Sequence, residues 1–262
     1  MRLNFFRYRL ASRSYLAAAS ISLILSGCAG TPPPPPGAFG PAPSVVMPGG
    51  ISFTRPQTIT HIVGPSETLW RISKTYGTDI DTLMRVNRLS DPEKIKNGQR
   101  LIIPNTFGPR PIIPLYPSNR WSHIVIHHTA TEGGNAHSID QLHHKRGFGN
   151  GLGYHFLIDN GTDGKQDGQI EVGPRWIKQQ DGAHANAGGM NEKGIGISLV
   201  GNYSERPVTQ RQLDALAFLV KTLQNYYRIP NHNVIRHSDV PGKNTECPGT
   251  RFPWVSFRQR LG

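Results

Sequence analysis

Two proline-rich segments divide this chain of 262 residues and limit where a packed core can form. Residues 32–36 are an unbroken proline run, and four further prolines fall between residues 105 and 119. Proline has no backbone N–H and a fixed φ, so such segments do not continue helices or enter central strands. We therefore expect residues 28–57 to be an extended tether and residues 105–119 a linker. Two blocks remain that can fold, residues 58–104 and 120–262.

The first 27 residues have the pattern of an export signal. They contain four arginines, no acidic residue and an apolar stretch from Tyr15 to Leu25. This stretch is shorter than the ~20 residues that a membrane-spanning helix needs, which favours a secretory signal. It ends in Leu25-Ser26-Gly27-Cys28, which resembles the lipobox of bacterial lipoproteins. The resemblance implies lipidation of Cys28, a membrane anchor and a place in the cell envelope. Because Ala29 follows the cysteine, it implies the outer membrane, facing the periplasm, in a Gram-negative cell. The alternative is an ordinary signal peptide with an incidental cysteine.

Charge and cysteine content restrict the partners of the exported chain. The leader contains four of the 29 Lys and Arg and none of the 17 Asp and Glu, so the rest of the chain has a net charge of +8. This favours anionic cell-wall polymers or lipid headgroups, and with an export signal we expect no nucleic acid partner. If Cys28 is lipidated, Cys247 has no disulfide partner. It is then either a metal ligand or a small buried apolar residue.

The pattern of residues 58–104 predicts a small β-α-α-β module. A short strand at 60–63 precedes a helix over 66–73, for which Ser66 is the expected N-cap and Gly77 the end. Thr78 is expected to open a second helix, and 101–104 to form the closing strand. The residues that carry a specific resemblance to the LysM module are Val63-Gly64-Pro65-Ser66-Glu67-Thr68-Leu69-Trp70, Val86-Asn87 and 95–104. The resemblance implies binding of glycan that contains N-acetylglucosamine, through loops near 64–68 and 87–91. We expect Trp70 to belong to the core rather than to stack on a sugar.

Residues 120–262 predict an α/β domain with a mixed central sheet flanked by helices. Strands are expected at 122–127, 154–159, 194–201 and 234–237, and helices at 138–145 and 209–227. Alternating strands and helices favour a sheet that is covered on both faces.

Two fragments of this block carry side chains that bind transition metals. One is Ile126-His127-His128-Thr129, and the other runs from His237 through Cys247-Pro248-Gly249. Two imidazoles and one thiol at the ends of buried elements would make a three-ligand zinc site. The fourth position would then be left for water, as in hydrolases.

Five ordered motifs resemble the type 2 N-acetylmuramoyl-L-alanine amidases, a superfamily that includes phage amidases and animal peptidoglycan recognition proteins. They are Val125 to Ala130, Gly153 to Ile158, Gly182 to Ala185, Gly194 to Tyr203, and His237 with Cys247-Pro248-Gly249. The resemblance implies Zn²⁺ held by His127, His237 and Cys247, with Tyr154 and Thr245 as catalytic residues. It implies substrate contacts for His184, Arg175 and Trp176, although a structural role for His184 is equally open.

Other histidines have structural alternatives. His143 or His144 could line the substrate groove, but a structural or solvated role is favoured for both. His155 alternates with Tyr154 and is expected to be a hydrogen-bonded core residue.

The resemblance implies hydrolysis of the amide bond between muramic acid and L-alanine of peptidoglycan. The glycan strand would bind through the LysM module and the stem peptide in the amidase cleft. A non-catalytic peptidoglycan receptor and a hydrolase for another bond remain as alternatives.

Overall fold

The computed structural model describes residues 43–46, 52–110 and 112–262. Residues from Pro41 to Gly262 form one compact unit. The expected leader, Cys28 and most of the expected tether lie outside the described residues. In the part of the chain that is described, no helix has the length and apolarity needed to cross a bilayer.

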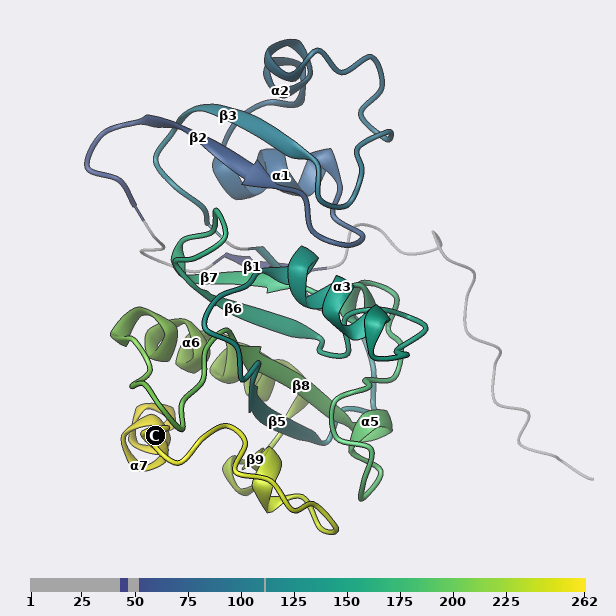
Figure 1. Cartoon of the computed structure of the whole chain (residues 1–262), viewed down its shortest axis with the longest axis vertical. Helices are drawn as coiled ribbons and strands as arrows, with labels where there is room; N and C mark the ends of the chain where they lie inside the picture. The colour runs from purple at the N-terminus through teal and green to yellow at the C-terminus, as the bar shows by residue number, and fades with distance from the viewer. Residues whose placement is uncertain (1–42, 47–51, 111) are drawn as a thin grey trace, which may run out of the picture. The chain divides into compact units, whose positions relative to one another are not determined.

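The N-terminal module has the expected β-α-α-β order (Figure 1). Strand β2 (Gln57–Ile62) pairs antiparallel with β3 (Arg100–Thr106), and helices α1 (Leu69–Tyr76) and α2 (Ile80–Asn87) lie between them in the chain. Apolar side chains from all parts of the module form one core, which contains Val63, Leu69, Ile72, Tyr76, Leu83, Leu101 and Ile103.

Both helices of this module begin later than the sequence suggested. The N-cap of α1 is Thr68, whose hydroxyl accepts from the Arg71 N–H, and Ser66 instead has a left-handed backbone with φ 61°. The N-cap of α2 is Asp79, whose carboxylate accepts from the Thr82 N–H. Thr and Asp are both favoured caps, so spacing alone could not choose among neighbouring candidates. Gly77 ends α1 as expected.

The C-terminal domain is built on a five-stranded mixed sheet in the order β7-β6-β8-β5-β9. The strands are β5 (His123–His128), β6 (Phe156–Asn160), β7 (Asp167–Val172), β8 (Gly194–Leu199) and β9 (Val234–Arg236). Strand β5 is parallel to β8 and β9, β6 is parallel to β8, and β7 is antiparallel to β6. The mixed α/β class is confirmed.

Helices and loops cover both faces of this sheet (Figure 1). Alternate residues such as Ile124, Ile126 and Ile197 pack into the main core with α6 (Gln210–Tyr227) and α7 (Trp254–Leu261). On the opposite face, Leu157 packs with Ile139 of α3 (Ala136–Lys145). Short helices α4 (Pro174–Ile177) and α5 (Met190–Lys193) and two 3₁₀ turns (Asn231–Asn233, His237–Asp239) complete the domain.

The two proline-rich segments contain more structure than their composition suggested. Strand β1 (Ser44–Val46) pairs antiparallel with β4 (Ile112–Pro114). Ile113 and Leu115 are buried in the main core of the C-terminal domain, and the Pro114 carbonyl accepts from the Trp176 indole N–H. Apolar residues between the prolines therefore anchor this segment to the domain.

Candidate metal centre and active site

His127, His237 and Cys247 meet on the face of the sheet opposite α6. His127 is near the end of β5, His237 begins the 3₁₀ turn after β9, and Cys247 follows ten residues later. Their ligand atoms lie within 4.8 Å of one another, and His127 Nδ1 is 3.7 Å from Cys247 Sγ. Of the adjacent histidines, His127 points into this cluster, whereas His128 Nδ1 accepts from the Tyr203 N–H.

A chain of hydrogen bonds fixes the tautomer of His127. His184 Nε2 lies 3.1 Å from the Gly194 carbonyl, which can only accept, so His184 carries its proton on Nε2. Its Nδ1 then accepts from His127 Nε2 at 3.1 Å. Burial lowers the pKa of His184 to about 4 and that of His127 well below its usual value, so both rings are neutral at pH 7. The His127 Nδ1 lone pair is therefore directed toward the cluster, as metal-ligating histidines require.

The other two side chains also direct potential ligand atoms into the cluster. His237 Nε2 is buried without a hydrogen-bond partner among the described residues, and burial lowers the pKa of His237 to about 4. Burial raises the pKa of the Cys247 thiol to about 12, although the His128 N–H donates to Sγ at 3.4 Å. A buried imidazole nitrogen without a partner is unfavourable, and a metal ion would satisfy it while binding the Cys247 sulfur as a thiolate.

The donor set fits zinc. Zinc takes nitrogen and sulfur ligands at ~2.0–2.3 Å in tetrahedral geometry, which places neighbouring ligand atoms about 3.3–3.8 Å apart. The separation of 3.7 Å between His127 and Cys247 matches this range. Three protein ligands leave one coordination position, which is typical of catalytic rather than structural sites.

Tyr154 lies beside this cluster. It is in a bend before β6 rather than in the strand expected at 154–159, and its ring centroid is 5.3 Å from that of His127. Burial raises the pKa of Tyr154 to about 12, and the neighbouring Cys247 acts in the same direction. The phenol therefore stays protonated at neutral pH and can donate a hydrogen bond.

Thr245 positions the loop that carries Cys247. Its hydroxyl oxygen accepts from the Cys247 N–H at 3.2 Å. Ser198 is directly opposite His127 in the β5–β8 register, and its buried hydroxyl has no partner among the described residues. This hydroxyl, at a position within the Gly194 to Tyr203 motif, is a further polar group of the site.

Two expected substrate contacts are buried. Trp176 is fully buried and donates to the Pro114 carbonyl. Arg175 is also buried, and its guanidinium donates to the carbonyls of Leu152 and Asp181. The structure gives both residues a structural role, because neither side chain is presented to an open groove. His184 likewise supports His127 from behind.

Two further histidines have defined structural contacts. His155 is fully buried, accepts from the Gly196 N–H and donates to the Gln180 carbonyl, which confirms its expected place in the core. His143 is buried, accepts from the Gly153 N–H through Nδ1, and lies 5.3 Å from Tyr154 between ring centroids. His144 is bonded to the Asp140 carbonyl of its own helix.

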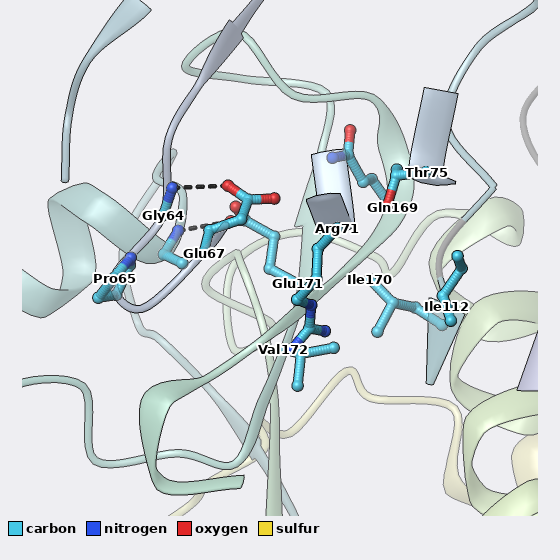
Figure 2. A pocket seen from close by; sticks show the side chains of 11 residues that line it. Gly64, Pro65, Glu67, Arg71, Thr75, Ile112, Gln169, Ile170, Glu171 and Val172 are labelled. Atoms are coloured by element: carbon cyan, nitrogen blue, oxygen red, sulfur yellow. Dashed lines mark hydrogen bonds between the residues drawn. The ribbon is translucent and has the colours of Figure 1, made fainter. Parts of the chain in front are cut away.

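In the N-terminal module, the expected position of Trp70 is wrong. Trp70 is 51% exposed, because α1 directs Leu69 and Ile72 rather than Trp70 toward the core. The loop after β2 is partly covered instead: Gly64 and Pro65 are buried. Figure 2 shows these two residues beside Glu67, Arg71 and Glu171 around a hollow of about 30 Å³, which holds about one water.

A mixed sheet that carries a buried His-His-Cys cluster on one face defines an α/β domain able to hold a catalytic metal. Residues 117–250 match the N-acetylmuramoyl-L-alanine amidase family, and the chain belongs to this family. Residues 61–104 match the LysM domain.

Three relatives illustrate the extent of the similarity. Peptidoglycan-recognition protein SC2 of Drosophila melanogaster is 34% identical over 152 residues, which are 54% of this chain and 74% of that protein. Spore coat assembly protein ExsA of Bacillus cereus is 46% identical over 46 residues, which are 17% of this chain and 7% of that protein. The solved endolysin N-acetylmuramoyl-L-alanine amidase from Clostridium intestinale is 36% identical, covers 54% of this chain and 84% of its own, and has a TM-score of 0.46.

Proposed function

We propose that this chain is a zinc-dependent N-acetylmuramoyl-L-alanine amidase that separates stem peptides from the glycan strands of peptidoglycan during cell-wall remodelling or turnover. The observation that carries the proposal is the convergence of His127, His237 and Cys247 within 4.8 Å. A receptor that only binds peptidoglycan has no chemical need for this donor set, whereas hydrolysis of an amide has one.

The chain's own residues would divide the work in the following way. His127, His237 and Cys247 would hold the zinc ion, which supplies a Lewis acid that polarises the scissile carbonyl. His184 holds the His127 ring in the required tautomer. Thr245 holds the backbone of Cys247 in place. Tyr154, protonated at neutral pH, would donate a hydrogen bond to the oxygen of the carbonyl as negative charge develops on it.

The direct test is product analysis. Purified protein loaded with zinc is incubated with intact sacculi, and the soluble fraction is analysed by mass spectrometry for free stem peptides. We expect release by the native chain, loss of release with a chelator and with Cys247→Ala, and no change in His232→Ala, an exposed histidine outside the cluster. Intact muramyl-peptide linkages with one zinc bound per chain would support the non-catalytic receptor instead. Peptides cut elsewhere would identify a different hydrolase.

The role of Tyr154 has its own test. Tyr154→Phe removes only the hydroxyl, so zinc content should stay at the native level while kcat falls by roughly 10²–10³-fold, the usual cost of one oxyanion donor. An unchanged kcat would remove Tyr154 from the mechanism.

We also propose that the chain is an exported lipoprotein, anchored through Cys28 and placed in the outer membrane facing the periplasm in a Gram-negative cell. The support is the sequence Leu25-Ser26-Gly27-Cys28 after an apolar stretch. Incorporation of a labelled fatty acid into the native chain but not into Cys28→Ser would be expected, and equal labelling of both would contradict the anchor.

A further inference from the structure

The tryptophan on α1 exposes a large apolar side chain to water, which is unfavourable for such a side chain. Trp70 is 51% exposed, whereas Trp121 and Trp176 are almost fully buried. A large exposed aromatic side chain is a common feature of binding surfaces, because its apolar face gains free energy when a ligand covers it. Among the described residues, Lys74 Nζ is the cation near its ring, 6.0 Å from the ring centroid. This is at the outer limit of a cation–π contact, so the contact can give way to a ligand.

Trp70 borders an open hollow in the LysM module. The hollow has a volume of about 540 Å³ and lies at the turn from α1 to α2. It is lined by Trp70, Ser73, Lys74, Gly77, Thr78, Asp79, Ile80 and Asp81. Gly77 has φ 65°, and no atom lies within 4 Å of the place where its Cβ would be, so the rim of the hollow is open here.

The rim of this hollow contains hydrogen-bond donors and acceptors, with both positive and negative charges. Asp79 Oδ1 is used as the N-cap of α2 and accepts from the Thr82 N–H, which leaves its second oxygen for a ligand. Asp81 and Lys74 are exposed, and Thr78 is half-buried. The flat Trp70 side chain is surrounded by carboxylate, hydroxyl and ammonium groups. Such a surface can bind a neutral ligand ring that has an apolar face and polar edges. A pyranose has this form, whereas an anionic polymer would be repelled by the two carboxylates.

The loop after β2, which the LysM resemblance associates with sugar binding, is accessible only in part, through Ser66 and Thr68. Gly64 and Pro65 are buried, and the hollow beside them is about 30 Å³ (Figure 2). That particular hollow, which residues of the other domain such as Glu171 also line, is too small for a sugar ring. On this module, the open hollow beside Trp70 is the larger of the two by a wide margin.

We propose that Trp70 and the α1–α2 turn form a sugar-stacking site for a neutral pyranose of the glycan strand, distinct from the loops at 64–68 and 87–91. The proposal rests on the glycan binding that belongs to the proposed function. The Trp70 indole would cover one face of the ring, and Asp79 and Asp81 would accept from its hydroxyl or amide groups.

The experiment measures sugar binding by tryptophan fluorescence on the full-length chain. The probe is a β-1,4-linked tetramer of N-acetylglucosamine, and the readout is protection of the fluorescence from acrylamide quenching. Trp121 and Trp176 are buried and Trp254 of the other domain is half-buried, so the part of the protection that is lost in Trp70→Ala reports on Trp70. We expect Trp70→Ala to weaken binding of the tetramer roughly tenfold when followed by calorimetry, and Trp70→Phe to retain most of it. Val255→Ala, which changes an exposed apolar residue of the other domain, should bind as the native chain does.

A parallel binding assay separates the possible failures. Sacculi treated with protease carry no protein, so a loss of sedimentation with these sacculi in Trp70→Ala cannot reflect a protein partner. If Trp70→Ala binds tetramer and sacculi as tightly as the native chain, the stacking site is wrong while the amidase proposal stands. If the native chain binds neither, both this site and glycan binding by the module are wrong. Release of peptide from a soluble muramyl peptide should be equal in the native chain and Trp70→Ala, and thermal melting should show that both are folded.

Discussion

At the scale of single side chains, the orientation of His127 depends on a buried neighbour that lies outside the three-residue cluster. His184 is buried; its Nε2 donates to the Gly194 carbonyl, and its Nδ1 accepts from His127 Nε2. The sequence placed His184 in a family motif but could not decide between substrate contact and support. That decision depends on which ring nitrogen faces which neighbour, and only the packed structure supplies this information.

We expect His184→Ala to weaken zinc binding by about 10–100-fold, because partners that orient a ligating histidine typically contribute this much. Competition with a fluorescent chelator measures the affinity directly, without an activity assay. His184→Asn keeps a polar side chain at the site and should recover part of the affinity. A native affinity in His184→Ala would mean that the β5 backbone alone orients His127.

At the scale of elements, a buried lysine joins strand β7 to the LysM module. Lys165 Nζ lies 2.5 Å from Glu171 Oε2 and donates to the Ile62 carbonyl at the end of β2. Both side chains of this ion pair are more than nine-tenths buried. Burial opposes the charge of Lys165, but Glu171 and Glu67 more than offset this effect, so its pKa is raised. A charged lysine between two modules is invisible to pattern analysis, because lysines are normally expected at the surface.

Lys165→Met should lower the free energy of unfolding by about 3–5 kcal/mol, since it leaves the Glu171 carboxylate buried without its partner. Urea denaturation followed by circular dichroism measures the difference. Lys94→Met is the matched control, because Lys94 pairs with Asp91 at the surface and such pairs contribute about 0–1 kcal/mol. Equal effects of the two substitutions would show that the buried pair does not stabilise the fold.

At the scale of the whole molecule, the order of elements and the convergence of His127, His237 and Cys247 were the most predictable features. Apolar periodicity located β5, β8 and α6, and the motif spacing identified His127, His237 and Cys247, because both signals are local. What failed depended on distant packing. Trp70 was expected in the core, but only one stripe of α1 faces it. Trp176 was expected in a groove, but it packs under a segment more than sixty residues earlier in the chain.

The proline-rich segment between the modules leads to a prediction about the stability of the C-terminal domain. Ile113 and Leu115 are buried in the main core of the amidase domain. A fragment that begins at Pro117 should therefore be less stable than one that begins at Phe107, by several kcal/mol, because deletion of a buried Ile or Leu side chain typically costs about 2–5 kcal/mol. Thermal melting of the two fragments tests this, with zinc present in both. Identical melting temperatures would mean that the segment only rests on the surface.

The separation of the expected metal ligands along the chain also affects when the ion can bind and how fast it can leave. His127 and Cys247 are separated by 120 residues, and they come together only when β5 lies beside the C-terminal segment. A newly made or unfolded chain therefore has no preformed pocket for the ion, and uptake must follow collapse of the domain. Once bound, the ion would link the two ends of the domain. Its dissociation would therefore be slow and would depend on opening of the whole domain rather than of one loop.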